Sequence, residues 1–226
     1  MTNQAGPNSG QAAIKRRFIA CTQSTGRIGK STVAEGLIGW LRYAGVAFVA
    51  VDADSQHRTL SHRYPCDVES FDATKTLDDF ARMIQAVPDF PIILVDFPAQ
   101  ATNFLLSAAE HFRLLEFFER SGIRPTLLIF AADDPTAKES ASKTVRFFGD
   151  AADYLLVENP AKYKSDEFMR TPLIKWLAER ETPKPRVPAV TAIAINAWEA
   201  LESSIVTCLL TKQADKMAYM NSAGTS

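Results

Sequence analysis

The sequence has few cysteines, and none of them lies in a recognisable pair. Its three cysteines, Cys21, Cys66 and Cys208, are far apart in the chain, and no CxxC motif occurs. This spacing is unlike that of a zinc ribbon or of a disulfide framework. We therefore expect neither kind of site, and we expect the protein to work in the reducing cytoplasm.

The chain also lacks long apolar runs and an excess of charge of one sign. No uninterrupted apolar stretch approaches the roughly 20 residues that span a bilayer, and the polar N-terminal residues lack the apolar core of a signal peptide. The 25 Lys and Arg residues are balanced by 26 Asp and Glu residues, so the overall charge does not favour nucleic acid or an anionic membrane as a partner. We expect no membrane attachment.

What is present fits one globular domain. With 226 residues and 46% hydrophobic content, the chain is long and apolar enough to bury a full core. The polar ends have no clear periodicity. We expect a disordered leader over residues 1–13, one folded domain over residues 14–210 and a flexible C-terminal tail over residues 211–226.

Short apolar runs alternate with segments of helical periodicity. The expected strands are Phe18–Cys21, Val46–Val51, Ile92–Val95, Leu127–Phe130 and Tyr154–Val157. The expected helices are Thr32–Tyr43, Thr76–Ala86, Phe104–Arg120, Lys138–Phe148, Glu167–Glu181 and Ala192–Leu210. This alternation predicts an α/β fold in three layers, with a mostly parallel sheet between helices. Trp40, Trp176 and Trp198 lie in the helical patterns, and we expect them to pack in the interior.

A glycine-containing turn follows the first strand. Residues 24–32 read Ser-Thr-Gly-Arg-Ile-Gly-Lys-Ser-Thr, between an apolar strand and a helical pattern. Such a turn points backbone N–H groups at phosphate oxygens, Lys30 adds a mobile charge, and Ser31 places a hydroxyl on Mg²⁺. Ser24 stands where the GxxxxGK[ST] motif has glycine. The alternative interpretation is an ordinary strand-to-helix turn with a chance lysine.

Carboxylates follow the second and third expected strands. Asp96 ends an apolar strand, which is how a Walker B aspartate reaches Mg²⁺ through water. Asp52 and Asp54 alternate along the chain, so only one of them is expected to face the phosphates. Asp54 lies further out, where it would orient an attacking water and approach the metal. The alternative for each aspartate is a turn or a helix N-cap.

Two further strand ends carry polar residues. Asp134 precedes Pro135 and is expected to cap the next helix. Asn159 follows the last expected strand, and its amide offers a donor and an acceptor that match the N6/N7 edge of adenine. A simple Asn-Pro turn is an equally good interpretation of Asn159.

In this order and spacing, residues 16–201 resemble the ParA/MinD family of deviant Walker A ATPases. The resemblance rests on Gly26-x-x-Gly29-Lys30-Ser31-Thr32, Asp52-x-Asp54-x-Gln56, Asp96-x-Pro98, Asn159 and a segment around Pro188 before the final helix. It implies nucleotide contacts from Thr25, Gly26, Arg27, Ile28, Gly29, Lys30, Ser31, Thr32, Asn159 and Pro188. It implies Mg²⁺ at Ser31, Asp96 and Asp54, catalysis by Lys30 and Asp54, ATP or ADP as the nucleotide, and a nucleotide-dependent homodimer.

One departure from the family pattern affects the expected chemistry. Thr25 stands where the family has its signature lysine, and Arg27 stands in place of the second family glycine. In relatives that lysine reaches the phosphates of the partner subunit, so its replacement puts this contribution to hydrolysis in question. Our hypothesis is that Arg27 supplies the missing charge across the interface or faces DNA.

The resemblance implies a Mg-ATP-dependent dimerisation switch with weak ATPase activity. Its expected role is plasmid partition, conjugative transfer or cargo positioning with a partner protein, like the TraL-type accessory proteins. The alternatives are a nucleotide-binding adaptor without hydrolysis and a metabolic P-loop enzyme that resembles dethiobiotin synthetase. Non-specific DNA would be a partner if the basic residues shared one face; otherwise they are ordinary surface charge. These residues are Lys15, Arg16, Arg17, Lys175, Arg180, Lys184 and Arg186.

Overall fold

The fold is given by a computed structural model, which describes residues 16–54, 57–64, 68–70, 77–86, 90–160 and 164–187. The strands are β1 (Arg16–Cys21), β2 (Phe48–Asp52), β3 (Val68–Ser70), β4 (Ile92–Asp96), β5 (Ile123–Ala131) and β6 (Asp153–Glu158). The helices are α1 (Lys30–Tyr43), α2 (Thr59–Arg63), α3 (Leu77–Ala86), α4 (Thr102–His111), α5 (Leu114–Arg120), α6 (Pro135–Phe148) and α7 (Pro172–Ala178). Short 3-10 turns lie at Gly149–Ala151 and Phe168–Arg170.

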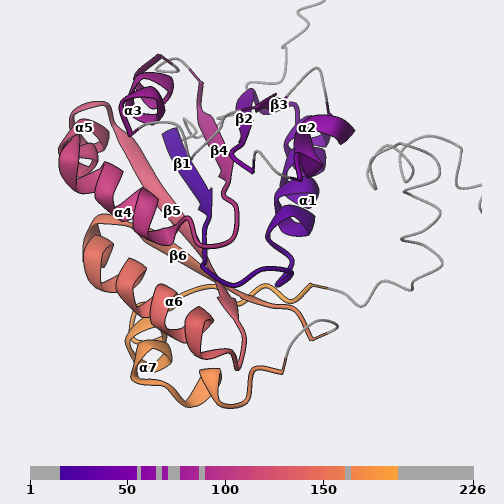
Figure 1. Cartoon of the computed structure of the whole chain (residues 1–226), viewed down its shortest axis with the longest axis vertical. Coiled ribbons are helices and arrows are strands. Elements are labelled where there is room, and N and C mark those ends of the chain that lie inside the picture. Colours follow the sequence, from indigo (N-terminus) through magenta and orange to yellow (C-terminus); the bar gives the residue numbers. More distant parts are fainter. Residues whose placement is uncertain are drawn as a thin grey trace, which may run out of the picture.

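The strands form one sheet in the order β3-β2-β4-β1-β5-β6, and every neighbouring pair runs parallel. Helices lie on both faces of this sheet (Figure 1). The central strands are largely apolar because both of their faces are covered, and all five residues of β4, including the terminal Asp96, are buried. The predicted α/β fold in three layers, that of a P-loop NTPase, is confirmed.

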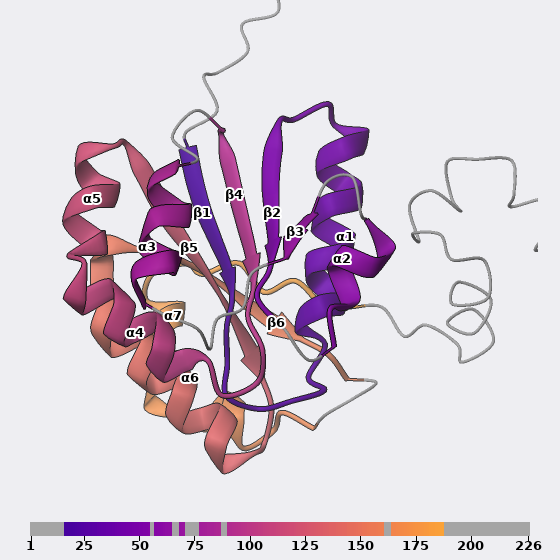
Figure 2. The ribbon, with the colours of Figure 1, turned by 45° about the horizontal axis from the view of Figure 1, so that its top comes forward.

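Each face of the sheet has its own apolar core. One core joins the sheet to α3, α4, α5, α6 and α7 and contains Phe18 and Phe80. The other joins the sheet mainly to α1 and α2 and contains Ile19 and Ile38. Phe18 and Ile19 are adjacent in β1 and enter opposite cores, because successive side chains of a strand point to opposite faces. Figure 2 shows α1 and α2 on one side and the other helices opposite.

Strand register brings the functional strand ends together. Cys21 of β1 and Asp52 of β2 both pair with Asp96 of β4. The loops that follow these three strands therefore leave the sheet side by side at its carboxyl edge. In open parallel sheets this edge is where ligands bind.

The predicted helix over Phe104–Arg120 is two helices. α4 ends at His111, and α5 begins at Leu114 after Arg113, which has a left-handed φ of 51°. The break changes the direction of the helix axis, and Leu114 and Phe118 of α5 are buried in the core. Apolar periodicity continues through such a break, so the sequence pattern did not reveal it.

The predicted helix over Glu167–Glu181 is also shorter than expected. A 3-10 turn at Phe168–Arg170 precedes α7, which begins at Pro172. Thr171 has extended backbone (φ −72°, ψ 153°), because a residue before proline is restricted in this way. The sequence analysis missed α2 and β3, which have five and three residues and are too short to show a clear period.

The tryptophan prediction is half right for the two tryptophans that the structure describes. Trp176 packs edge-on against the ring of Tyr154, with ring centroids 5.5 Å apart. Trp40 is 58% exposed on the outer side of α1, so the prediction that it packs in the interior was wrong. The periodicity of α1 places its apolar stripe elsewhere, on Ala34, Ile38 and Leu41.

Several sequence predictions fall outside the described residues. These are the leader, Lys15, Gln56, Pro188, the last helix over 192–210 with Trp198, and the tail. In the part of the chain that the structure describes, no helix is both long and apolar enough to cross a bilayer.

Candidate functional site

The loop between β1 and α1 has the backbone of a phosphate cradle. Gly29 has a φ of 99°, in the left-handed region, and a Cβ placed there would lie 2.4 Å from Nδ2 of Asn159. Glycine is therefore required at position 29 by both conformation and space. Arg27, which stands at a glycine position of the family pattern, is also left-handed, with a φ of 60°. Its side chain is exposed at the rim of the loop.

Lys30 is held inside this loop. It begins α1, is 7% exposed, and donates from Nζ to the carbonyl oxygen of Thr25 at 3.0 Å. Burial lowers the pKa of Lys30, and the nearby Asp96 carboxylate opposes this effect. In this structure the Lys30 ammonium therefore donates its hydrogen bond to a backbone carbonyl of the same loop that would bind the phosphates. If a phosphate oxygen replaced this carbonyl, the Lys30 ammonium would donate to a charged acceptor in place of a neutral one. Such a charge-assisted hydrogen bond is stronger.

Asp96 lies next to the start of α1. It is 2% exposed, its carboxylate is hydrogen-bonded by the Ser31 side chain, and its Oδ1 has no hydrogen-bond partner among the described residues. A buried carboxylate oxygen without a partner beside a serine hydroxyl fits a hydrated Mg²⁺ ion, which binds to few protein oxygens and keeps its water shell. The residues present therefore fit the metal that the sequence predicted at Ser31 and Asp96.

Burial gives Asp96 a measurable effect on stability in metal-free and nucleotide-free protein. It raises the pKa of Asp96 from 3.8 to about 7, partly opposed by Ser31 and Lys30. Because the folded protein holds the proton of Asp96 more tightly than the unfolded chain does, Asp96 favours the fold most at a pH below the unfolded pKa of 3.8. This stabilisation is lost as the pH rises through the folded pKa of about 7. The stability that this pKa shift of Asp96 can change is at most about 4 kcal/mol.

We therefore expect the Asp96→Asn variant to be more stable than the natural protein at about pH 8, and the difference to shrink toward about pH 5. The measurement is the free energy of urea unfolding with EDTA present. An equal stability difference at both pH values would contradict the assignment. The Asp133→Asn variant, which changes an aspartate outside this cluster, is the control.

Asp52 has a structural role, and Asp54 faces the site. Oδ2 of Asp52 accepts from the backbone N–H groups of Leu60 and Ser61, at 2.9 and 3.0 Å, at the start of α2. Oδ1 accepts from the backbone of Asp54 at 3.1 Å. Both oxygens of Asp52 are thus used within the protein. Asp52 is not itself the N-cap residue of α2, which is Arg58, but its Oδ2 accepts from the first turn of that helix from a distance in the chain. Of the two aspartates, only Asp54 lines the pocket beside Lys30.

Replacing Asp52 with alanine should therefore lower stability. Two backbone N–H groups at the start of α2 would lose their acceptor, which costs about 1–3 kcal/mol. Urea unfolding of Asp52→Ala measures the loss. Asp54→Ala, two residues away and half-exposed, should cost clearly less. Equal losses for the two variants would show that Asp52 does not stabilise the start of α2.

Asp54 and His57 form one wall of the pocket over the loop. The backbone N–H of His57 donates to Oδ1 of Asp54 at 3.0 Å, and Nδ1 of His57 lies 3.3 Å from Oδ2. The pocket has a volume of about 610 Å³, which is in the range of small-molecule sites. Its lining residues are Gly26, Arg27, Gly29, Lys30, Ser31, Thr32, Asp54, His57, Phe97 and Ala99. From the sequence, the pair His57-Arg58 could contact phosphate or a partner, but solvated loop charge was the favoured interpretation; in the structure His57 lines the pocket.

Thr25, at the place of the signature lysine, is turned into the protein. Its hydroxyl donates to Oδ1 of Asp134 at 2.7 Å, and the same oxygen accepts from the backbone of Ala137 at 2.9 Å. Asp134 is therefore the N-cap of α6, as predicted. These two donors hold the pKa of Asp134 below its usual value. Thr25 thus joins the loop to α6.

Gln23 is a second anchor of the loop that sequence reasoning missed. It is 1% exposed, and its amide exchanges hydrogen bonds with the backbone of Phe130, at 2.9 Å and 2.8 Å. It also donates to the carbonyl of Ala137 at 3.1 Å. Gln23 thereby fixes the end of β1 to β5 and α6. Nothing in the sequence around Gln23 indicates these contacts, because its partners lie on β5 and α6, far away in the chain.

Asn159 comes to the loop from the far end of the chain. It is 8% exposed, and its Nδ2 donates to the carbonyl of Ile28 at 3.2 Å. The following connector returns alongside β6, where the backbone N–H of Val187 donates to the carbonyl of Glu158 at 2.8 Å. The structure thus brings every described predicted site residue to one edge of the sheet. Pro188, the next residue after Val187, lies outside the described residues.

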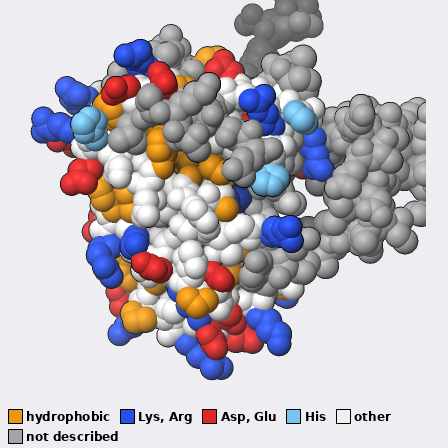
Figure 3. Space-filling view, in the orientation of Figure 1, with side chains coloured by type: hydrophobic (Ala, Val, Ile, Leu, Met, Phe, Trp, Pro, Cys, Tyr) orange, Lys and Arg blue, Asp and Glu red, His pale blue; other side chains and the backbone are white. Residues whose placement is uncertain are grey.

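Three of the basic residues are engaged within the protein, and two of them, Arg17 and Arg180, line one pocket at the edge of the sheet opposite the β1–α1 loop. Arg16 donates to the carbonyl of Ser121 at 3.0 Å, Arg17 pairs with Asp153 at 2.6 Å, and Arg180 pairs with Asp150 at 2.8 Å. On the face shown in Figure 3, Lys and Arg side chains are interspersed with Asp and Glu. Binding of DNA phosphates by a shared basic face stays a prediction.

Neither a protein-family model nor a curated protein matches the sequence. Solved structures do match the fold. A chain of the MinC:MinD cell division protein complex of Aquifex aeolicus is 12% identical, with a TM-score of 0.53, over 84% of this chain and 87% of that one. A ParA family ATPase of Chlorobium tepidum TLS is 12% identical, with a TM-score of 0.50, over 88% and 94%.

A nucleotide-binding protein of Archaeoglobus fulgidus, in complex with ADP, is 13% identical, with a TM-score of 0.50, over 79% of this chain and 84% of that one. At these identities the similarity concerns the arrangement of the chain. This protein therefore has the fold of the MinD and ParA P-loop ATPases.

Proposed function

We propose that this protein binds Mg-ATP in the pocket over the β1–α1 loop and uses it as a dimerisation switch of the ParA type. The observation that carries the proposal is the buried Asp96 carboxylate, whose Oδ1 has no partner among the described residues, beside Ser31 and Lys30. A structural aspartate at this depth would have its oxygens satisfied, as both oxygens of Asp52 are.

The residues of the pocket have distinct parts in this function. Lys30 leaves the Thr25 carbonyl and neutralises charge on the phosphates, while the positive φ of Gly29 lets the loop turn its backbone N–H groups toward them. Mg²⁺, held by Ser31 and Asp96 and approached by Asp54, would supply further charge neutralisation. Asp54 orients the attacking water, and His57 holds the carboxylate of Asp54 in place. Asn159 and Pro188 would contact the base.

Gel filtration and calorimetry test this function together. We expect binding of Mg-ATP and Mg-ADP, and a shift from monomer to dimer with Mg-ATP or a non-hydrolysable analogue but not with Mg-ADP. Repeating the runs with duplex DNA tests whether the dimer binds nucleic acid. Absence of any heat of association with adenine nucleotides on folded protein would refute the proposal.

Arg27 is proposed to act across the dimer interface. Its side chain is exposed at the rim of the pocket, whereas Thr25 is hydrogen-bonded to Asp134 and carries no charge. We expect Arg27→Ala to keep ATP binding within about fivefold, because an exposed charge contributes about 1 kcal/mol or less. We expect it to lose ATP-induced dimerisation.

The matched control for this variant is Arg58→Ala. Arg58 is also an exposed, left-handed arginine, with a φ of 46°, and it does not line the pocket. Unchanged dimerisation, turnover and DNA binding in Arg27→Ala would remove Arg27 from the mechanism.

One observation favours a second function, that of an adaptor that binds ATP without hydrolysing it. The hydroxyl of Thr25 is hydrogen-bonded to Asp134, so position 25 offers no charge to a partner's phosphates. Measuring phosphate release with and without DNA distinguishes the two functions. ATP-dependent dimerisation with no turnover under either condition would favour the adaptor.

A further inference from the structure

The two faces of the sheet are covered unequally by the described helices. On one face, α3 to α7 form a layer that extends over β5 and β6. On the other face, α1 packs on β1 and β4, and α2 packs on β2 and β3. Figure 2 shows α1 and α2 beside β2 and β3. The α1-side face of β5 and β6 is thus less covered by the described helices than the same face of β1, β2 and β4.

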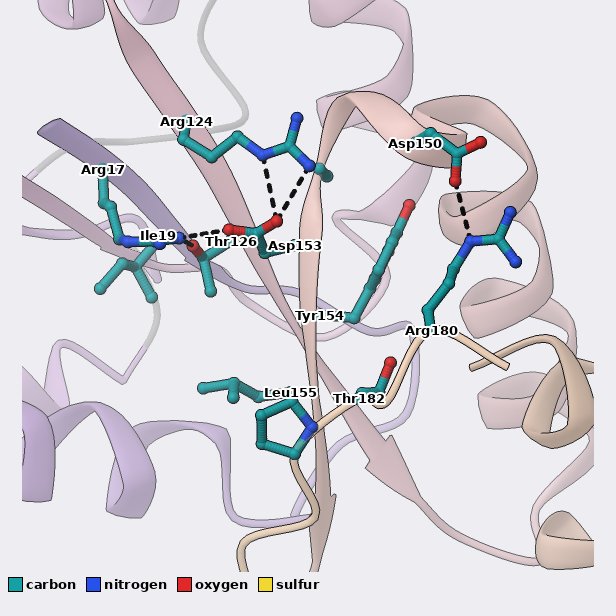
Figure 4. Close-up of a pocket in the computed structure, with 12 residues that line it drawn as sticks. Arg17, Ile19, Arg124, Thr126, Asp150, Asp153, Tyr154, Leu155, Arg180 and Thr182 are labelled. Atoms are coloured by element: carbon teal, nitrogen blue, oxygen red, sulfur yellow. Dashed lines mark hydrogen bonds and ion pairs between the residues drawn. The ribbon is translucent and has the colours of Figure 1, made fainter. Parts of the chain in front are cut away.

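A pocket of about 600 Å³ lies on this part of the sheet, at the edge opposite the β1–α1 loop. Half of its lining is made of alternate residues of three strands, namely Arg17, Ile19, Arg124, Thr126, Asp153 and Leu155 (Figure 4). The other half comes from the turn before β6, the start of β6 and the segment after α7, namely Asp150, Ala152, Tyr154, Arg180, Thr182 and Pro183. Leu155 is only half-buried, whereas its neighbour Leu156, which points to the opposite core, is fully buried. Leu155 is therefore an apolar sheet residue that the described chain leaves partly uncovered.

The polar side of this pocket is positively charged. Arg17 donates from Nη1 to Oδ2 of Asp153 at 2.6 Å and to Oγ1 of Thr126 at 2.8 Å. Arg124 donates to Oδ1 of Asp153 from Nε at 3.1 Å and from Nη2 at 2.9 Å. Two guanidinium groups thus share one carboxylate, as Figure 4 shows. A ligand that combines apolar side chains with carboxylates would complement this surface.

The chain itself supplies such a segment at the right place. The described chain ends at Val187, which is bonded to the carboxyl end of β6 and packs against the α1-side core. In residues 188–211, Glu199 and Glu202 are the only charged residues. An apolar stripe at helical spacing runs through Ala194, Trp198, Leu201, Ile205 and Cys208. Both glutamates flank this stripe on the same side.

We propose that residues 192–210 dock as a helix on the α1-side face of β5 and β6. The apolar stripe would cover Ile19 and Leu155, and Glu199 and Glu202 would face Arg17 and Arg124. The length is sufficient, since a helix of this size is about 28 Å long and β6 is about 20 Å long. This proposal does not depend on nucleotide binding, because the pocket lies at the opposite edge of the sheet from Lys30.

The test uses Trp198 as a reporter in nucleotide-free protein. The variants Trp40→Phe and Trp176→Phe are combined, so that Trp198 is the only tryptophan of the chain. We expect Trp198 to emit at shorter wavelength than in a synthetic peptide of residues 188–226, and acrylamide to quench it several-fold less. We also expect both signals to be independent of protein concentration.

A matched pair of variants then locates the docking site. Leu155→Asp should raise the quenching of Trp198 toward that of the peptide. Leu115→Asp, which changes a half-buried leucine of α5 on the opposite side of the sheet, should leave it unchanged. If either variant lacks the native circular dichroism, the pair Leu155→Ala and Leu115→Ala is compared instead.

Three results would overturn the proposal. Quenching in the intact protein as strong as in the peptide would mean that the segment is not docked. Equal effects of the Leu155 and Leu115 variants would place the segment elsewhere. A blue shift that disappears on dilution would mean that a second copy of the chain, and not the same molecule, covers the pocket.

Discussion

Replacing Lys30 with alanine should abolish nucleotide-induced dimerisation and weaken Mg-ATP binding by about 30-fold to several thousandfold. The reason is that phosphates bound to the loop would lose a buried cation, and truncating one partner of a buried charge pair costs about 2–5 kcal/mol. The measurements are titration calorimetry with Mg-ATP and gel filtration with a non-hydrolysable analogue. Unchanged ATP binding in this variant would contradict the proposed site.

The fold of the Lys30→Ala variant should survive, which separates loss of binding from loss of structure. Lys30 is 7% exposed and its burial lowers its pKa, so the folded protein bears a cost for keeping the ammonium charged. Removing the side chain also removes this cost. The unfolding midpoint without nucleotide should therefore stay close to that of the natural protein.

The control for Lys30→Ala is a lysine in an ordinary surface pair. Lys143 lies on α6, is about half-exposed, and pairs with Glu139 at 2.8 Å. We expect Lys143→Ala to bind Mg-ATP within about twofold, because exposed pairs contribute about 0–1 kcal/mol and do not touch the phosphates. A similar loss of Mg-ATP binding in both variants would mean that binding depends on the total positive charge of the protein and not on the position of Lys30.

Replacing Gly29 with alanine should destabilise the protein by about 2–4 kcal/mol and disrupt the loop. The φ of 99° is unfavourable for an L-residue, and the new Cβ would meet Nδ2 of Asn159 at 2.4 Å. The hydrogen bond from Asn159 to the carbonyl of Ile28 would be displaced with it. Urea unfolding measures the loss, and calorimetry with Mg-ATP measures the consequence for binding.

Gly36→Ala is the matched control for this prediction. Gly36 lies in the middle of α1, and a Cβ there has no heavy atom within 4 Å. Alanine at this position should stabilise the helix by about 0.5–1 kcal/mol. Effects of the same sign and size at Gly29 and Gly36 would mean that the loop does not need glycine.

A double variant separates the two causes of the Gly29 effect. In Gly29→Ala combined with Asn159→Ala, the steric conflict is removed and only the backbone strain stays. The two changes should therefore be non-additive, with the double variant more stable than the sum of the single effects implies. Strict additivity would mean that Asn159 does not contact the loop at position 29.

The Asp52 and Asp54 pair illustrates what a pattern can predict and what it cannot. In a continued strand Asp52 and Asp54, two positions apart, would lie on the same face, so alternation by itself does not separate them. The strand ends at Asp52. The choice between them depends on α2, a five-residue helix that the sequence pattern did not reveal. Once α2 is in place, its N–H groups occupy Asp52.

Asn159 and Thr25 illustrate the same limit at longer range. Asn159 is separated from Ile28 by 131 residues and Thr25 from Asp134 by 109, so no local pattern describes either contact. Only the order of the strands, with β1 between β4 and β5, brings these positions to the same loop. The same applies to Gln23, whose partners lie on β5 and α6.

The sequence by itself determined the α/β class, the parallel strands, the glycine positions of the loop and the polar residue after each functional strand. These features are local, because strand and helix periods, turn conformations and helix starts depend on residues a few positions apart. The tertiary structure alone decided which aspartate faces the site, where Thr25 points, and what Asn159 contacts. These outcomes depend on sheet order and on competition for hydrogen bonds between segments that are far apart in the chain.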